Sequence, residues 1–379
     1  MVLWLLVFLV WNVNANSDRL ACTRGLTCHV QKDHLDVFVI GDTGGESEFK
    51  TSNGSVLGIA LDVGTNFLSM SQPTEIQTKV ANSMVKLAER EGLDFIVNVG
   101  DNIYWNGVDN VNDDRFKNVF EEPYKNPRLQ VPWYMLAGNH DHLGNVDAQI
   151  EYTTRSKIWT LPSLFYKTSH SFGQKGTRVE FVFIDTVVLC GNSVNVQSRS
   201  IFSWMGASAK VPERPAAKYV QESKKQWKWI EEQLRTSKAD HLFVVGHYPI
   251  YSVITKTLQC LKRELDPLMR KYKVGAYFAG HNHNLQYYRD SKPQNKWQMR
   301  YVVSGAGSRS GSWGRQKGTE RNVQLLYRFP KHRESAITSE LGYGDGGFVQ
   351  LKIEPNGARL RFYARDLRLE HEDLIPSRR

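Results

Sequence analysis

Five apolar runs in the chain end on a glycine that is followed directly by a residue able to bind a metal ion. The pairs are Gly41-Asp42, Gly100-Asp101, Gly138-Asn139, Gly246-His247 and Gly280-His281. In open α/β sheets, ligands bind beyond the carboxyl ends of strands, and glycine there lets the backbone turn sharply under a bound group. Each pair alone is an ordinary strand-end turn, but the five together indicate one shared site at the edge of a sheet.

Two further candidate ligands stand close to these pairs. His283 comes two residues after His281, so both side chains project to the same side of an extended chain. Tyr104 comes three residues after Asp101, so one helical turn would place both on one face. Seven ligands are too many for one ordinary site, and a carboxylate can bridge two ions, so the set predicts a two-metal centre. Carboxylates and a phenolate suit a trivalent ion, whereas an amide and imidazoles suit a divalent one.

The elements that must position these ligands are strands buried on both faces, alternating with helices. Helical apolar spacing recurs at residues 76–88, just before Gly92, and again at residues 220–234 and 261–272. This order predicts an α/β domain with a layered sheet core, and no linker or repeat divides it. The continuous apolar runs that predict strands are residues 37–40, 95–99, 133–137, 179–184, 241–245, 274–279 and 301–303.

The composition is that of a globular protein. The chain has 379 residues, of which 41% are hydrophobic and 23% charged, which excludes a disordered chain, a collagen-like fibre and a coiled coil. The 49 Lys and Arg exceed the 39 Asp and Glu, which favours anionic partners. These basic residues are scattered rather than gathered in a stripe with aromatic residues, so we expect no nucleic-acid ligand. We expect a monomer.

The amino terminus predicts export. Residues 1–15 are predicted to be a signal peptide, because an apolar run ends in Val13-Asn14-Ala15, and cleavage is expected after Ala15. A membrane anchor is the alternative, but the run is shorter than the ~20 apolar residues of a span. No other stretch could cross a bilayer, so we expect a secreted or lysosomal protein. Asn53 begins an N-glycosylation sequon, which agrees with export.

Export permits disulfide bonds. The four cysteines allow three pairings, and locality favours Cys22 with Cys28 and Cys190 with Cys260. The first pair lies in an N-terminal segment, residues 16–33, ahead of the domain expected over residues 34–379. Residues 191–215 and 305–319 are rich in polar residues and predict long loops, which in compact domains are usually functional or mobile. Bland solvent loops are the alternative.

The motifs resemble those of the purple acid phosphatases, a branch of the metallophosphoesterases. Generic metallophosphoesterases have a His where this chain has Gly44, and they lack the tyrosine at the position of Tyr104. The resemblance is closest to the small animal tartrate-resistant type and extends from about residue 35 to about residue 365. It implies a four-layer α/β/β/α sandwich with a single catalytic domain. The matching blocks are GDTG at 41–44, GDNIY at 100–104, GNHD at 138–141, GHYP at 246–249 and GHNH at 280–283.

The resemblance also implies a ligand assignment. One set of ligands would bind ferric iron, and another set would bind a divalent ion, which is iron, zinc or manganese. It further implies the Cys190–Cys260 disulfide and an exposed loop at residues 191–215 that caps the site until a protease cuts it. The implied ligands are Asp42, Tyr104 and His283 for ferric iron, Asn139, His247 and His281 for the divalent ion, and Asp101 as the bridge.

The activity that the resemblance implies is that of an acid phosphatase. Its substrates would be phosphate monoesters, among them phosphoproteins, nucleotides and small aryl or alkyl phosphates, attacked in line by a hydroxide that the two metals supply. His140, next to Asn139, is the candidate for contacting phosphate or protonating the leaving group, with Asp141 as its orienting partner. A purely structural His140 is the alternative.

Two departures from the animal pattern bear on substrate binding. The family's Glu-His pair after the His247 position is Thr255-Lys256 here, and residues 307–310 differ from the family's substrate-side loop. Lys256 and Arg309 are therefore candidates for binding substrate phosphate, with solvated loop cations as the alternative. Two other functions stay open. One is an iron-carrying or scaffold protein with little turnover, and the other is a phosphodiesterase or nuclease, which would need a basic and aromatic groove.

Overall fold

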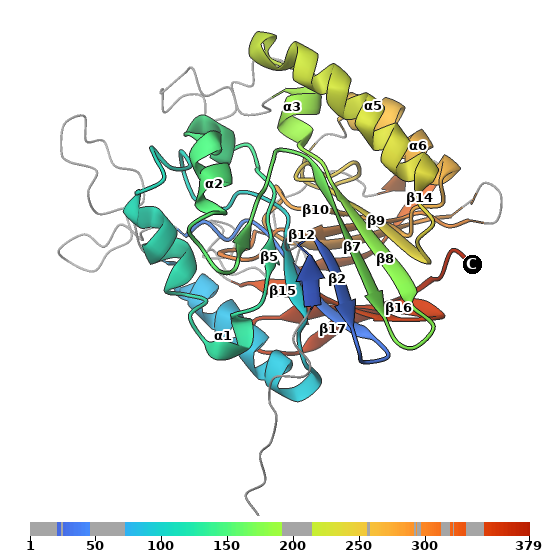
Figure 1. Ribbon diagram of the computed structural model, residues 1–379, viewed down its shortest axis with the longest axis horizontal. Coiled ribbons are helices and arrows are strands. Elements are labelled where there is room, and N and C mark those ends of the chain that lie inside the picture. Colours follow the sequence, from blue (N-terminus) through green and yellow to red (C-terminus); the bar gives the residue numbers. More distant parts are fainter. Residues whose placement is uncertain are drawn as a thin grey trace, which may run out of the picture.

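Two mixed β-sheets form the centre of the molecule. The computed structural model describes residues 26–45, 73–191, 214–255, 258–291, 293, 297–311, 322–330 and 345–379, together with the backbone of strands at 21–23 and 319–320. The first sheet has ten strands in the order β1-β2-β7-β8-β9-β10-β12-β11-β14-β13, and the second has seven in the order β17-β16-β15-β3-β4-β5-β6. In Figure 1, α3, α5 and α6 gather beside the first sheet, and α1 lies on the opposite side of the molecule.

The strands of the ten-stranded sheet are β1 (Ala21–Thr23), β2 (Thr27–Val30), β7 (Tyr166–Phe172), β8 (Thr177–Phe183), β9 (His241–Val245), β10 (Ala276–Ala279), β11 (Leu285–Asp290), β12 (Arg300–Ser304), β13 (Thr319–Glu320) and β14 (Val323–Phe329). Those of the seven-stranded sheet are β3 (Leu35–Ile40), β4 (Phe95–Asn98), β5 (Trp133–Tyr134), β6 (Trp159–Thr160), β15 (Gly347–Glu354), β16 (Gly357–Ala364) and β17 (Leu369–Pro376). Each apolar run predicted to be a strand overlaps one of these, so the strand predictions are confirmed in their positions, although β5 contains only residues 133–134 of the run 133–137 and β10 begins at residue 276.

Helices cover the outer faces of both sheets. The described helices are α1 (Glu75–Glu91), α2 (Val146–Tyr152), α3 (Thr186–Cys190), α5 (Val220–Thr236) and α6 (Asp266–Lys271), with short 3₁₀ or π segments at Phe116–Glu121, Pro127–Leu129, Asp141–Leu143, Ala217–Tyr219 and Leu261–Leu265. The four-layer α/β/β/α arrangement is therefore confirmed. Among the described residues, none of the helices combines the length and apolar character that crossing a bilayer requires.

The continuous apolar runs have a packing reason, which β9 illustrates. Phe243 and Val245 point into the core between the two sheets, whereas Leu242 and Val244 pack in a second core against the outer helices. Successive side chains of a strand point to opposite faces, so a strand with a core on each side needs apolar residues at every position.

The helix α1 follows from its sequence. The Thr74 side chain accepts a hydrogen bond from the backbone of Gln77 at 2.9 Å and so caps the amino end of the helix. The helix buries Val80 and Met84 on one face, and Gly92 follows its last residue with a φ of 92°, a value that glycine adopts without strain. The helix therefore begins and ends where the apolar spacing predicts.

The two ends of the chain complete the sheets. The strand β2 pairs parallel to β7, so the amino-terminal segment is part of the ten-stranded sheet. Cys28 is disulfide-bonded and its register partner on β1 is Cys22, whose side chain lies outside the described residues. The antiparallel strands β15, β16 and β17 extend the seven-stranded sheet beside β3. The predicted signal peptide and Asn53 lie outside the described residues.

Candidate metal centre

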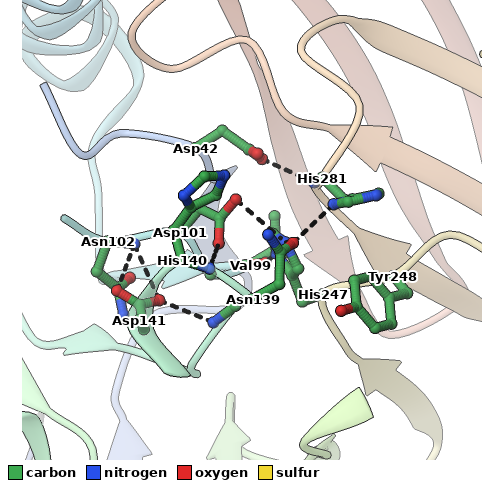
Figure 2. A network of polar contacts seen from close by, with 12 residues as sticks. Asp42, Val99, Asp101, Asn102, Asn139, His140, Asp141, His247, Tyr248 and His281 are labelled. Carbon is green, nitrogen blue, oxygen red and sulfur yellow. Dashed lines mark hydrogen bonds and ion pairs between the residues drawn. The ribbon is translucent and has the colours of Figure 1, made fainter. Parts of the chain in front are cut away.

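The carboxyl ends of the parallel strands bring the predicted ligands to one edge. The strands β3, β4 and β5 run parallel in one sheet, and β8, β9 and β10 run parallel in the other. The predicted ligands follow β3, β4, β5, β9 and β10 in the sequence. Figure 2 shows the side chains that these turns carry, from Asp42 to His281, converging from both sheets. The expected shared site is therefore present in the fold.

The backbone is strained at three of these positions. Asp42, Asp101 and His281 have φ angles of 55°, 52° and 68°, in the left-handed region that residues with a side chain rarely adopt. Such conformations cost about 1–3 kcal/mol each and persist where the surroundings hold them. At Asp42, the backbone carbonyl accepts hydrogen bonds from the amide of Ser308 at 3.0 Å and from its hydroxyl at 2.7 Å. Strain concentrated on three candidate ligands marks the edge as a functional site.

The glycines before the ligands leave room for neighbouring ligands. A Cβ atom on Gly280 would come within 2.5 Å of the Asp42 carboxylate, and one on Gly138 would collide with the carboxylate and amide of Asp101. A side chain at either position would push a ligand away from the centre. This close approach explains why glycine precedes the ligand-type residue in the turns after β5 and β10.

Acidic and histidine side chains form two groups that share one residue. Asp101, His247 and His281 form the first group, and Asp42, Asp101 and His283 form the second. In each group the candidate ligand atoms lie within 4.8 Å of one another, close enough for a single metal ion to contact all three. The carboxylate common to both groups belongs to Asp101, the residue predicted to bridge two ions.

The amide of Asn139 completes the first group. Its Oδ1 atom lies 3.0 Å from Nε2 of His247 and 2.8 Å from Nδ1 of His281 (Figure 2). The other nitrogen of His247, Nδ1, donates a hydrogen bond to the backbone carbonyl of Val99 at 2.8 Å. A histidine ligand is commonly held in this way by its second nitrogen, which fixes the tautomer and aims the free nitrogen at the metal.

The phenol of Tyr104 completes the second group. Its hydroxyl donates to Oδ1 of Asp42 at 3.1 Å and lies 2.9 Å from Nε2 of His283. On its ring lies the guanidinium of Arg309, whose central carbon is 4.5 Å from the ring centroid. Arg309 is 5% exposed and also covers the ring of Trp105, at 4.4 Å. Arg309 is therefore part of the site and not a solvated loop cation.

The charges of the centre indicate a place for cations. Burial raises the pKa of Asp42 to about 8 and lowers the pKa of His281 to about 3. Burial alone would also raise the pKa of Asp101, but the neighbouring His247 holds it below its ordinary value. Burial disfavours the charged form of His247, yet the Asp101 carboxylate raises its pKa to about 9. Buried carboxylates need paired charge, and bound metal ions are the usual source of it among imidazoles and carboxylates.

The ring of His140 stands beside this centre. Its Nδ1 donates a hydrogen bond to the backbone carbonyl of Trp105 at 2.6 Å, and its backbone amide donates to Oδ1 of Asp101 at 2.9 Å. The ring packs edge-on against Tyr104, with centroids 4.8 Å apart. Because Nδ1 is engaged, Nε2 is the nitrogen that can reach a substrate.

The contacts of Asp141 differ from the predicted orienting role. Its buried carboxylate accepts hydrogen bonds from the backbone amides of Gly138 at 2.7 Å and Asn102 at 3.1 Å, and from the side-chain amide of Gln149 at 2.9 Å. Figure 2 shows it below the centre, turned toward Asn102. Asp141 therefore joins the turns after β4 and β5, and it is a backbone carbonyl that orients His140.

The remaining predicted residues have different outcomes. Lys256 lies outside the described residues. Its neighbour Thr255 accepts a hydrogen bond at 3.4 Å from the side chain of Asn282, the residue between His281 and His283. The disulfide between Cys190 and Cys260 is present, with Cα atoms 5.8 Å apart, so that prediction is confirmed. Most of the predicted exposed loop, residues 192–213, lies outside the described residues.

One residue at the site was missed by the sequence reasoning. Trp105 is 39% exposed, contacts Arg309 and His140 with its ring, and orients His140 with its carbonyl. The one feature of the sequence that could have identified Trp105 as a site residue is its position directly after Tyr104. Its neighbours in the sequence do not show whether a tryptophan is exposed or buried.

Comparisons with known proteins agree with this geometry. The sequence pattern of the Calcineurin-like phosphoesterase family matches residues 35–285. The chain is 41% identical over 230 residues to "Tartrate-resistant acid phosphatase type 5" of Homo sapiens, and the match covers 60% of this chain and 65% of the human protein, slightly less than two thirds of its length. It is 32% identical over 294 residues to "Purple acid phosphatase 4" of Arabidopsis thaliana, covering 76% of this chain and 75% of the plant protein.

A solved structure shows the same fold. The protein described as "GAP50 the anchor in the inner membrane complex of Plasmodium" matches with a TM-score of 0.65 and 22% identity, over 92% of this chain and 90% of that chain. The family pattern, the relatives and the arrangement of the motif residues point the same way. The chain belongs to the calcineurin-like phosphoesterase family and, within it, to the purple acid phosphatases.

Proposed function

We propose that this protein is an acid phosphatase that hydrolyses phosphate monoesters at a centre of two metal ions. The observation that carries the proposal is the sharing of Asp101 by two groups of ligand-type side chains. A shared carboxylate between two such groups is the arrangement of two-metal phosphatases, in which the ions clamp the attacking and leaving oxygens. The names of the relatives, which are acid phosphatases, support the same activity.

The residues present fit two different ions. The group with the Tyr104 phenol and the Asp42 carboxylate suits ferric iron, and the group with the Asn139 amide and two imidazoles suits a divalent ion, either iron, zinc or manganese. Asp101 would contact both. When bound, the two ions neutralise the phosphate oxygens and activate water as the nucleophile. This assignment gives particular residues of this chain the metal-binding roles that the family resemblance implies.

The protein's own residues would then handle the leaving group. His140 donates its Nδ1 proton to the Trp105 carbonyl, so Nε2 carries a proton only when the ring is the imidazolium ion. Protonation of the leaving oxygen by Nε2 therefore requires the doubly protonated ring. Arg309 adds a fixed positive charge beside Tyr104, which favours an anionic substrate.

The compartment and the regulation are further parts of the proposal. The Cys190–Cys260 disulfide is the kind of bond that persists in oxidising compartments, and it supports a secreted or lysosomal protein with residues 1–15 as the signal peptide. Residues 191–215 would cap the site until a protease cuts them. Activity measured before and after limited trypsin treatment tests the cap, and unchanged activity of the cut protein would contradict it.

A pH–rate profile with p-nitrophenyl phosphate tests the proposed activity. The purified chain is compared with Asp101→Asn, which keeps the volume of the shared ligand, and with Asp109→Asn, an exposed acidic residue, as the matched control. We expect an acid optimum that Asp101→Asn abolishes and Asp109→Asn preserves. Bis(p-nitrophenyl) phosphate, a diester, should be hydrolysed far more slowly.

Metal analysis of the same samples separates the alternatives. We expect two metal ions for each wild-type chain and fewer for Asp101→Asn. A folded chain that contains both ions but hydrolyses neither ester would contradict the phosphatase and favour the iron-carrying or scaffold function. Faster hydrolysis of the diester than of the monoester would instead favour a phosphodiesterase.

A further inference from the structure

We propose that Trp105 forms a subsite for the leaving group, and that the enzyme thereby favours phosphate monoesters whose leaving group is aromatic. The inference rests on the proposed phosphatase function and narrows its substrate class. Trp105 is not among the residues predicted from the sequence to bind metal or substrate.

The exposure of Trp105 is the first observation. Among the described residues, no other Trp, Tyr or Phe side chain is as exposed as Trp105, at 39%. Its neighbour Tyr104 is 4% exposed, and the other aromatic rings at this edge are packed into the protein. Among the described residues, Arg309 and His140 contact this ring, and much of it still faces solvent beside a cluster of charged groups. Tryptophan is enriched at binding interfaces, where part of its ring is covered and part is wet.

The position of Trp105 relative to His140 is the second observation. The two ring centroids are 5.2 Å apart, and the Trp105 carbonyl accepts the Nδ1 proton of His140. A leaving oxygen that takes a proton from Nε2 of His140 must come within about 3 Å of that nitrogen. The carbon skeleton attached to this oxygen then lies within reach of the indole ring. Among the described residues, Trp105 thus offers an apolar surface to the organic part of a substrate.

The support behind Trp105 is the third observation. The Arg309 guanidinium lies 4.4 Å from the indole centroid and 4.5 Å from the Tyr104 centroid, so one cation covers both rings. Cation–π contacts of a buried guanidinium hold an aromatic ring in a defined orientation. The indole therefore does not need to be ordered when a substrate binds, which makes stacking on it more favourable.

The substrate class follows from the chemistry of an indole surface. An aromatic leaving group can stack on it or meet it edge to face, whereas the short alkyl chain of a serine or glycerol phosphate offers little area. A stacked aromatic pair corresponds to about a 3- to 10-fold gain in affinity beyond ordinary burial. We therefore expect selection for aryl phosphates and phosphotyrosine side chains over alkyl phosphates.

Equilibrium binding of two phosphonates tests the subsite without the reactivity of the leaving group. Phenylphosphonate and methylphosphonate carry the same anionic group and are not hydrolysed, so their affinities differ only through the organic part. Dissociation constants are measured by titration calorimetry on the metal-loaded full chain. The variants are Trp105→Ala and Trp105→Phe. The control is Leu369→Ala, which truncates an apolar side chain on β17 that is 49% exposed.

We expect Trp105→Ala to bind phenylphosphonate about 3- to 10-fold more weakly, with the affinity for methylphosphonate unchanged within about 2-fold. Trp105→Phe should keep most of the preference, which also guards against a folding defect of the alanine variant. Equal weakening of both ligands would assign Trp105 a positioning role through His140 and overturn the subsite, as would no change in either. A wild-type chain that binds both phosphonates but hydrolyses no monoester would contradict the phosphatase while leaving the binding test valid.

Discussion

The Nδ1 atom of His140 lies 2.6 Å from the backbone carbonyl oxygen of Trp105, so the residue after Tyr104 orients the histidine. The ring of His140 also packs against both aromatic rings of that turn. The turn after β4 therefore supplies a candidate ligand, an exposed indole and the carbonyl that orients an imidazole from the turn after β5. This hydrogen bond joins the candidate proton donor, His140, to the residue proposed to form the leaving-group subsite.

Substitution of His140 should affect poor leaving groups most. For His140→Gln, we expect kcat for glycerol phosphate to fall by about 10²- to 10⁴-fold, because an alkoxide must be protonated as it leaves. The loss for p-nitrophenyl phosphate should be much smaller, since nitrophenolate leaves without a proton. Steady-state kinetics on both substrates measure the difference. The exposed His29→Gln serves as the control, and equal losses on both substrates would show that His140 only maintains the structure.

Addition of one methyl group at Gly138 should weaken metal binding at the centre without unfolding the chain. A Cβ there collides with the Asp101 carboxylate and amide, so Gly138→Ala must displace the shared ligand. We expect metal affinity at least about 10-fold lower, as measured by mass spectrometry of the dialysed protein. Gly176→Asn is the matched control, because that position has open space and a positive φ that Asn tolerates. Full metal content in Gly138→Ala would contradict the crowding argument.

A buried histidine that is not part of the candidate metal centre should reduce stability in acid. His170 stacks on Phe95 with ring centroids 4.3 Å apart, and neither of its ring nitrogens has a hydrogen-bond partner among the described residues. Burial lowers its pKa to about 3 from an ordinary value near 6.5. Between these values the unfolded chain binds the extra proton and the folded chain does not, so the free energy of unfolding falls as the pH falls.

His170→Phe should remove this pH dependence. The loss at pH 5 relative to neutral pH is about 2 kcal/mol for this one group, from 1.36 kcal/mol per pH unit below 6.5. Urea unfolding at pH 7 and pH 5 measures the free energy of unfolding of both proteins. The decrease between the two pH values should be smaller in the variant by about that amount, and an identical decrease would mean that the buried ring is protonated in the folded state.

The Cys190–Cys260 bridge should contribute substantially to stability. It closes a loop with a sequence separation of 70, and a loop of that length constrains the unfolded chain by about 4 kcal/mol. The double variant Cys190→Ser/Cys260→Ser should therefore unfold at a lower urea concentration than the oxidised protein. Wild-type protein in reducing agent should match the variant. A reduced wild type that unfolds at the same urea concentration as the oxidised form would refute this contribution.

The predictability of the site differs from one residue to the next. The strand ends and the ligand-type residues that follow them could be identified from the sequence, because buried strands need continuous apolar runs and a metal needs oxygen or nitrogen ligands. The contacts of Asp141 could not, since they depend on Asn102 and Gln149, which other segments of the chain supply. A carboxylate next to a histidine in the sequence suggests that the two side chains pair. In the folded chain the carboxylate of Asp141 instead accepts hydrogen bonds from amide groups.

The same distinction holds for the fold. The amino-acid sequence by itself determined the order of helices and strands, the helix ending at Gly92 and the family, because these depend on local spacing and on motif residues. Only the tertiary structure decided that Arg309 lies on the rings of Tyr104 and Trp105. The arginine is some two hundred residues away from these rings in the chain. Local propensity carries no information about such distant contacts, because they form only when both sheets pack and their edges meet.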